Sequence, residues 1–201
     1  MTDNPFDAER HTCPICDGAS LSHYKVDYRN VRIGRCDACG AQFMNPPYSD
    51  EYLARYYAEY NEAEEIDRWQ ETLTYCHDFY LSLIERFGRV GHLLDIGCGN
   101  GHLIRAALAR GWTAEGFDVS DESTKRVADE LGVTVHLGSF RDIDLPKNAF
   151  DLATMHHVLE HVKEPAAYIG KIHRLLRDDG LVFIASPNIR GLSHRLKNMF
   201  E

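Results

Sequence analysis

The stretch Leu93-Leu94-Asp95-Ile96-Gly97-Cys98-Gly99-Asn100-Gly101-His102-Leu103 decides the fold that we expect for this chain. Its apolar start predicts a buried strand, its three alternate glycines predict a turn, and residues 103–108 predict a helix. Glycine allows positive φ and close approach to the backbone, so this turn can present N–H groups to a ligand at a helix N-terminus. A dinucleotide site is excluded, because His102 stands where the motif G-x-G-x-x-G has its third glycine. Asp95 would also repel a pyrophosphate, whereas it would attract an ammonium group.

Short apolar runs alternate with helical patterns after this turn. Strands are predicted at 113–117, 133–137, 150–155 and 181–185, and helices at 121–131 and from Pro165 to Gly180. This alternation indicates a parallel α/β sheet. Asp118 follows the second strand, 23 positions after Asp95, where an acid can hold both ribose hydroxyls of an adenosine. Asp118 could instead be the N-cap of the next helix, but together with the glycine turn the ribose role is favoured.

These motifs resemble those of class I S-adenosylmethionine-dependent methyltransferases. The run His156-His157-Val158-Leu159-Glu160-His161-Val162 is similar to the H-V-L-E-H stretch of small-molecule members, including the ubiquinone-biosynthesis O-methyltransferases. The resemblance covers residues 91–188 and implies a Rossmann-like three-layer core that binds S-adenosylmethionine. The resemblance implies that Asp95 binds the methionine amino group and that Asp118 binds the ribose. It also implies that the floor of the site is formed by Gly97, Cys98, Gly99 and Gly101. The residues expected beside the adenine are Val119, Ser139 and Phe140, and His156 is expected in the pocket. Ser139 replaces the acid that the family has at this turn, so the backbone N–H of Phe140 is the expected adenine contact.

The candidate catalytic residues are His157, Glu160 and His161. If residues 157–161 form one helical turn, these three side chains share a face, and a histidine can take the proton of a methyl acceptor. In some relatives the equivalent face is E-x-x-E-H and binds a divalent metal; His157 departs from that pattern. The alternative is that Glu160 and His161 only brace the pocket.

The family adds an antiparallel hairpin, strands six and seven, after the fifth strand. Residues 189–201 are too few and too polar to supply it, so we expect a chain truncated at its C-terminus. The uncovered edge of the fifth strand would then favour self-association, and a homodimer is predicted.

Four cysteines form two C-x2-C pairs, Cys13 with Cys16 and Cys36 with Cys39, separated by nineteen residues. This spacing predicts a structural zinc ribbon over residues 1–45, with two short strands at 24–28 and 31–35. Disulfides do not suit a chain with no visible export signal, and a redox C-x-x-C would ordinarily be single. Gly18 and Gly40 are expected to have positive φ in the turns that aim the thiolates.

Residues 46–90 are predicted to be a helical connector between the ribbon and a core at 91–201. Five tyrosines, Tyr48, Tyr52, Tyr56, Tyr57 and Tyr60, are expected mostly to pack on a neighbour. The alternative is a lid on the cofactor pocket, with Tyr57 or Tyr60 bordering it. A second helix is predicted at about 66–87, with Gly88 after its end.

The composition limits the function. A formal net charge of −9 disfavours nucleic acid as a partner. The sequence has no long apolar run and no signal peptide, so we expect no membrane contact and a cytoplasmic location. Together with these limits, the resemblance to the methyltransferases implies methyl transfer from S-adenosylmethionine to a small-molecule acceptor, such as a metabolite or a sugar. The alternatives are an RNA methyltransferase whose ribbon contacts RNA, or a cofactor-binding module without activity.

Overall fold

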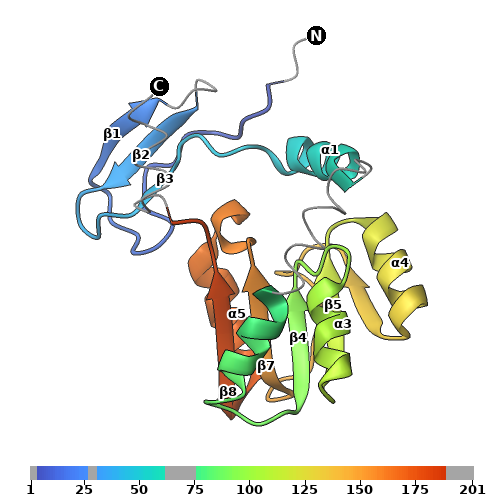
Figure 1. The fold of residues 1–201 in the computed structure, drawn as a ribbon. Helices are drawn as coiled ribbons and strands as arrows, with labels where there is room; N and C mark the ends of the chain where they lie inside the picture. The colour runs from blue at the N-terminus through green and yellow to red at the C-terminus, as the bar shows by residue number, and fades with distance from the viewer. Residues whose placement is uncertain (1–3, 27–30, 62–75, 189–201) are drawn as a thin grey trace, which may run out of the picture.

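The computed structural model describes residues 4–26, 31–61 and 76–188. Figure 1 shows a small antiparallel sheet near the N-terminus and, below it, a larger sheet with helices on both faces. No helix in these ranges is long and apolar enough to cross a membrane.

The larger sheet has five parallel strands in the order β6-β5-β4-β7-β8, which confirms the predicted fold class. Its strands are β4 (His92–Ile96), β5 (Thr113–Asp118), β6 (Thr134–Leu137), β7 (Phe150–His156) and β8 (Leu176–Ala185). The helices between them are α3 (His102–Ala109), α4 (Asp121–Leu131), the 3-10 turn η1 (Leu159–His161) and α5 (Pro165–Leu175).

Two hydrophobic clusters lie on opposite faces of this sheet and make three layers. Adjacent side chains of a strand point to opposite faces, so Leu93 packs with α3 and Leu94 packs with α5. Residues 76–84 are helical and add Leu81 and Ile84 to the first cluster. Figure 1 shows this segment in green, in front of the sheet and beside β4. The predicted helix at 66–87 therefore covers the sheet over its described part, while residues 66–75 lie outside the described ranges.

The last helix ends earlier than predicted, and the last strand is longer. α5 ends at Leu175 instead of Gly180, because Leu176 already pairs with Phe150 at the start of β8. The register then shifts before Leu181 pairs with Leu152, and Arg177 in this irregular stretch donates to both carboxylate oxygens of Asp151 at 2.7 Å. Within the described ranges β8 pairs only with β7; residues 189–201 lie outside them, and the homodimer stays a prediction.

The N-terminal sheet has three strands where two were predicted: β1 (Leu21–Val26), β2 (Arg32–Cys36) and β3 (Gln42–Met44). Helix α1 (Asp50–Asn61) follows, and the rings of Tyr48, Tyr52 and Tyr56 stack in succession with centroids 4.6 and 6.5 Å apart. Packing is thus the observed role of these three rings, while the side chains of Tyr57 and Tyr60 lie outside the described part.

Lys163 ties this N-terminal region to the larger sheet. Its Nζ lies 2.7 Å from Asp7 and 2.5 Å from Asp50 of α1, and its backbone carbonyl accepts a bond from Arg10 at 3.0 Å. Since Lys163 follows η1 by two residues, the N-terminal region holds one end of the segment that carries the candidate catalytic residues.

Candidate functional site

The glycine turn joins β4 to α3 at the carboxyl end of the parallel sheet. Gly97, Gly99 and Gly101 have φ of 76°, 50° and 73°, as the spacing predicts. The N–H groups of Gly97 and Cys98 donate to the carbonyl of Phe117 at 2.7 and 3.0 Å, which anchors the turn on β5.

The three glycines are needed for different reasons. A Cβ on Gly97 would lie 2.4 Å from Val158, and one on Gly101 would lie 2.8 Å from Val127. A Cβ on Gly99 would meet nothing within 4 Å, so the turn is open on that side and a ligand can approach the backbone there. The Cys98 side chain is buried in the core, and burial raises the pKa of its thiol, so only its backbone can contribute to a site.

Asp95 and Asp118 lie beside this turn. Asp95 is only 3% exposed and accepts a 2.7 Å hydrogen bond from the Thr154 hydroxyl. Burial raises the pKa of Asp95 to about 7, and the nearby charge of Asp118 acts in the same direction. The two carboxylate oxygens of Asp118 accept bonds from the N–H groups of Gly99 at 2.8 Å and Ser120 at 2.9 Å.

The predicted N-cap alternative for Asp118 is wrong. Helix α4 begins at Asp121, as predicted, but its N-cap is Ser120, whose hydroxyl accepts a bond from the N–H of Ser123 at 3.2 Å. Asp118 instead links the glycine turn to the end of β5, next to the open side of Gly99.

Two exposed apolar side chains stand at the ends of the neighbouring strands. Val119 follows β5 and is 53% exposed, and Leu137 ends β6 and is 48% exposed. The N–H of Gly138 donates to the carbonyl of Asp118 at 3.3 Å, which places the turn after β6 against the end of β5. Ser139 is exposed in this turn, whereas the Phe140 side chain is fully buried, so Phe140 can offer a ligand only its backbone.

The candidate catalytic segment is not one α-helical turn. His157 has φ of 57°, a left-handed value that is uncommon outside glycine, and the 3-10 turn η1 begins only at Leu159. His157 and Glu160 nevertheless meet, with Nδ1 and Oε1 3.3 Å apart, and Ser186 donates to the other oxygen of Glu160 at 3.0 Å. His161 is exposed at the end of η1, and the structure does not place it on a shared helical face with the other two.

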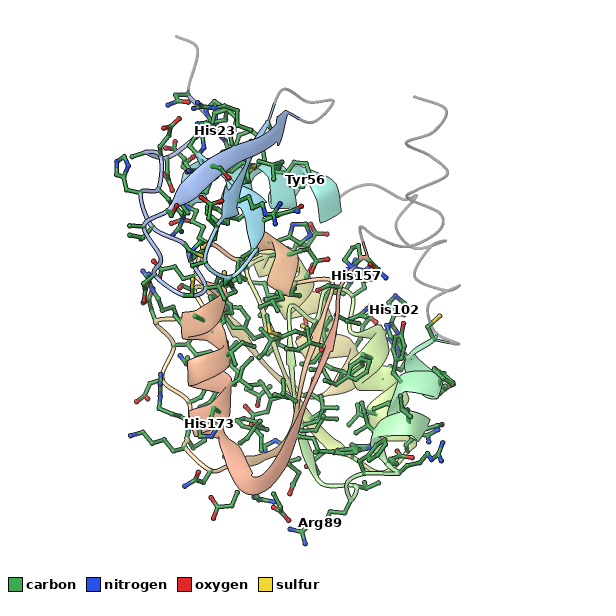
Figure 2. All side chains as sticks on the ribbon, turned by 90° about the vertical axis from the view of Figure 1, so that its left-hand side faces the viewer. His23, Tyr56, Arg89, His102, His157 and His173 are labelled. Atoms are coloured by element: carbon green, nitrogen blue, oxygen red, sulfur yellow. The ribbon has the colours of Figure 1, made fainter. Side chains whose placement is uncertain are left out.

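His156 lies in a group of rings that includes a residue the sequence did not reveal. His77, from the helical segment 76–84, has its ring centroid 5.2 Å from that of His156, and Tyr80 lies 5.5 Å from His156. His77 Nδ1 and His156 Nε2 are buried without a hydrogen-bond partner. Burial lowers the pKa of both imidazoles, that of His77 to about 4. Figure 2 shows His102, at the start of α3, near His157 at the same end of the sheet.

The four cysteines converge at the edge of the N-terminal sheet. The sulfur of Cys13 lies 3.7 Å from that of Cys39, Cys16 and Cys36 have the same separation, and all four sulfurs lie within 4.8 Å of one another. Tetrahedral zinc with bonds of about 2.3 Å requires sulfur separations of about 3.8 Å, so this donor set fits the ion.

One glycine in this centre differs from the prediction. Gly40 has φ of 75°, as expected, but at the first pair the left-handed residue is Asp17, at 57°, and not Gly18. Gly18 has little space around it, because a Cβ there would lie 3.3 Å from that of Ala38 and 3.4 Å from the sulfurs of both Cys16 and Cys36.

Comparisons with known proteins agree with this geometry. Residues 66–200 match the family profile described as a methyltransferase domain. The ubiquinone biosynthesis O-methyltransferase of Pseudomonas aeruginosa (strain LESB58) is 38% identical over 115 residues, which cover 52% of this chain and 48% of that protein. The enzyme of the same name from Haemophilus ducreyi is 34% identical over 106 residues, 48% of this chain and 45% of that protein. The chain thus spans about half the length of the curated relatives it matches.

Two solved structures share the fold. The crystal structure of the PH0226 protein from Pyrococcus horikoshii superimposes with a TM-score of 0.54 at 21% identity, over 69% of this chain and 66% of that one. A provisionally assigned S-adenosyl-L-methionine-dependent methyltransferase from Methanococcus maripaludis gives a TM-score of 0.53 at 22% identity, over 61% of each chain.

Proposed function

The chain belongs to the methyltransferase domain family, and from that premise we propose that it binds S-adenosylmethionine and transfers its methyl group to a small-molecule acceptor. The observation that carries the proposal is the pairing of Asp118 with the open glycine turn. A ligand that approaches the open side of Gly99 meets glycine backbone, the carboxylate of Asp118 and the exposed Val119. This order suits a ribose between an amino acid and an adenine.

The residues beside the glycine turn have distinct roles in the proposed complex with S-adenosylmethionine. Asp95 holds the ammonium group of the methionine, since a buried carboxylate is stabilised by an opposite charge. Asp118 keeps its bonds to the turn and accepts the ribose hydroxyls on its remaining lone pairs. Val119 and the turn at Ser139 border the adenine.

His157 and Glu160 are proposed as the acid–base pair. S-adenosylmethionine supplies an electrophilic methyl group on a sulfonium. His157 takes the proton of an acceptor hydroxyl as the oxygen bonds to that methyl carbon, and Glu160 stabilises the imidazolium from 3.3 Å. The bond between the methyl carbon and the sulfur breaks in the same step, its electron pair stays on the sulfur, and S-adenosylhomocysteine is the leaving group. The positive φ of His157 is an uncommon backbone conformation of a kind that functional sites often maintain. His161 is kept as the second candidate base.

A hydroxylated small molecule is the proposed class of acceptor. The curated relatives carry the name O-methyltransferase, and the buried, neutral imidazoles of His77 and His156 give this end of the sheet polar but uncharged donors and acceptors. The four-cysteine centre is proposed to hold structural zinc, because four thiolates close the coordination sphere. We keep the division into residues 1–45, 46–90 and 91–201 as part of the same proposal.

Isothermal calorimetry with S-adenosylhomocysteine tests the proposed cofactor. We expect binding to the wild-type chain, and a loss of at least about tenfold in affinity for D118N, because a neutral amide accepts the ribose hydroxyls less strongly. D121N is the matched control, since Asp121 is an exposed acid at the start of α4 that pairs with Lys125. The absence of binding to the wild-type chain even at millimolar ligand would refute the function.

Turnover tests the acid–base pair once a hydroxylated acceptor has been found by screening. H157A should lower kcat by about 100-fold, and E160Q by a smaller factor, because the imidazole remains as the base. If H157A retains full turnover while H161A loses it, the base is His161.

A further inference from the structure

A lysine of α5 holds the turn that follows β6. The Nζ of Lys171 donates to the backbone carbonyls of Phe140 at 2.6 Å and Arg141 at 3.2 Å, and also to that of Ile143. The same Nζ lies 5.0 Å from the centroid of the Phe140 ring. A cation bonded to several carbonyls of one turn fixes the directions of that turn's peptide groups.

The peptide between Ser139 and Phe140 is oriented by this arrangement. The carbonyl of Ser139 accepts bonds from the N–H groups of Asp142 at 3.0 Å and Ile143 at 3.1 Å, so it points into the turn. In a planar trans peptide the N–H is directed opposite to the C=O. The N–H of Phe140 is therefore directed away from the interior of the turn.

The Phe140 ring is the other fixed point of the turn. It is fully buried and contacts Phe117 of β5 and Tyr168 of α5, with ring centroids 5.3 and 5.2 Å away. With the ring anchored in the core and the carbonyls bonded to Lys171, the backbone of the turn has little freedom to rotate.

The space beside this turn suits a flat heterocycle. Val119 and Leu137 expose apolar surface at the ends of adjacent strands, and Asp118, the proposed ribose ligand, is bonded to the turn through Gly138. A purine has two apolar faces and ring nitrogens that accept hydrogen bonds at its edge. An apolar platform with one oriented N–H donor matches both features.

We propose that Lys171 is a positioning residue for the adenine of the cofactor. Lys171 does not touch the adenine; it fixes the turn so that the N–H of Phe140 donates to a ring nitrogen. The inference rests on the proposed function, because it requires that an adenosyl ligand binds at Asp118.

The test compares two ligands that differ only in the base. S-adenosylhomocysteine carries the adenine, and S-ribosylhomocysteine has the same ribose and amino acid without it. In K171M the dissociation constant of S-adenosylhomocysteine should rise about tenfold, the loss of one well-placed hydrogen bond, while that of S-ribosylhomocysteine should change less than about twofold. K171R keeps the charge and the hydrogen-bond donors, so it should retain most of the wild-type affinity for S-adenosylhomocysteine.

The matched control is K147M, which removes an exposed lysine from the loop before β7, at the opposite end of the sheet. It should leave both dissociation constants unchanged. A merely structural role for Lys171 would weaken both ligands equally in K171M, and that result overturns the inference, as does unchanged binding of both. If K171M melts below the assay temperature, K171Q replaces it, since its side chain retains an amide donor. K171Q must then raise the dissociation constant of S-adenosylhomocysteine by a smaller factor than K171M is expected to, without raising that of S-ribosylhomocysteine. Failure of the wild-type chain to bind S-adenosylhomocysteine would instead overturn the proposed function, and the inference with it.

Discussion

The ionisation of Asp95 should control cofactor affinity near neutral pH. Burial raises the pKa of this carboxyl from 3.8 to about 7, although the hydrogen bond from Thr154 acts in the opposite direction. Only the ionised form attracts the ammonium group of the methionine. With a pKa of about 7, about 90% of the chains carry the carboxylate at pH 8 and about 10% at pH 6. The apparent dissociation constant should therefore rise about tenfold between pH 8 and pH 6.

Calorimetry with S-adenosylhomocysteine at pH 6, 7 and 8 measures the slope of the dissociation constant against pH directly. In D95N the slope should disappear, and the affinity at pH 8 should fall by about 10- to 100-fold, because a charge-assisted hydrogen bond is lost. D121N changes an exposed acid and should keep the wild-type slope. A wild-type dissociation constant that is equal at pH 6 and pH 8 would refute the assignment of Asp95 to the ammonium group.

The same pKa shift predicts how stability depends on pH. Because the folded-state pKa of Asp95 lies above its unfolded value, the contribution of this carboxyl to stability is fully present below about pH 4 and is lost as the pH rises through 7. The shift of about three pKa units corresponds to about 4 kcal/mol. D95N should therefore melt at a higher temperature than the wild-type chain at pH 8, and the difference should vanish near pH 4. Lower thermal stability of D95N at pH 8 would contradict this reasoning.

Two further predictions concern the glycine turn and the cysteines. G97A should lower the free energy of unfolding in urea by about 3 kcal/mol, because its Cβ would approach Val158 to 2.4 Å at a φ of 76°; G132A, also at positive φ but with open space, should cost only about 1 kcal/mol. Equal losses for the two variants would mean that the turn relaxes around the added methyl group. Purified protein should contain about one zinc ion per chain by mass spectrometry, less in C16S and the same in C76S, since Cys76 lies outside the cluster. Full zinc content in C16S would exclude Cys16 as a ligand.

The relation between Asp118 and its neighbours depends on the tertiary structure. The sequence spacing predicted an acid at the end of the second strand, which β5 confirms. In the structure both oxygens of Asp118 accept bonds from backbone N–H groups, and Ser120 caps α4 instead. This arrangement follows from the way the end of β5 packs against the glycine turn. That contact removes the N-cap role of Asp118, which the sequence had left as the alternative to the favoured ribose role.

Local chemistry determined much of this protein from the sequence alone. Four features depend on residues close together in the chain. They are the positive φ at the alternate glycines, the bounds of α4, the alternation of strands and helices, and the convergence of two C-x2-C pairs. Backbone preferences, helical periodicity and metal-ligand spacing act over such short distances, and they are readable without a fold.

Contacts between distant segments decided the rest. α5 stops at Leu175 because the start of β7 offers Leu176 a partner, and no local signal marks that end. His77 meets His156 only because the helical segment 76–84 packs over the sheet, and Lys171 reaches the turn at Phe140 because α5 covers the other face. The sequence by itself therefore determined which motifs this chain carries. Only the tertiary structure decided which side chains stand beside them, because packing across a sheet joins residues that share no periodicity or spacing.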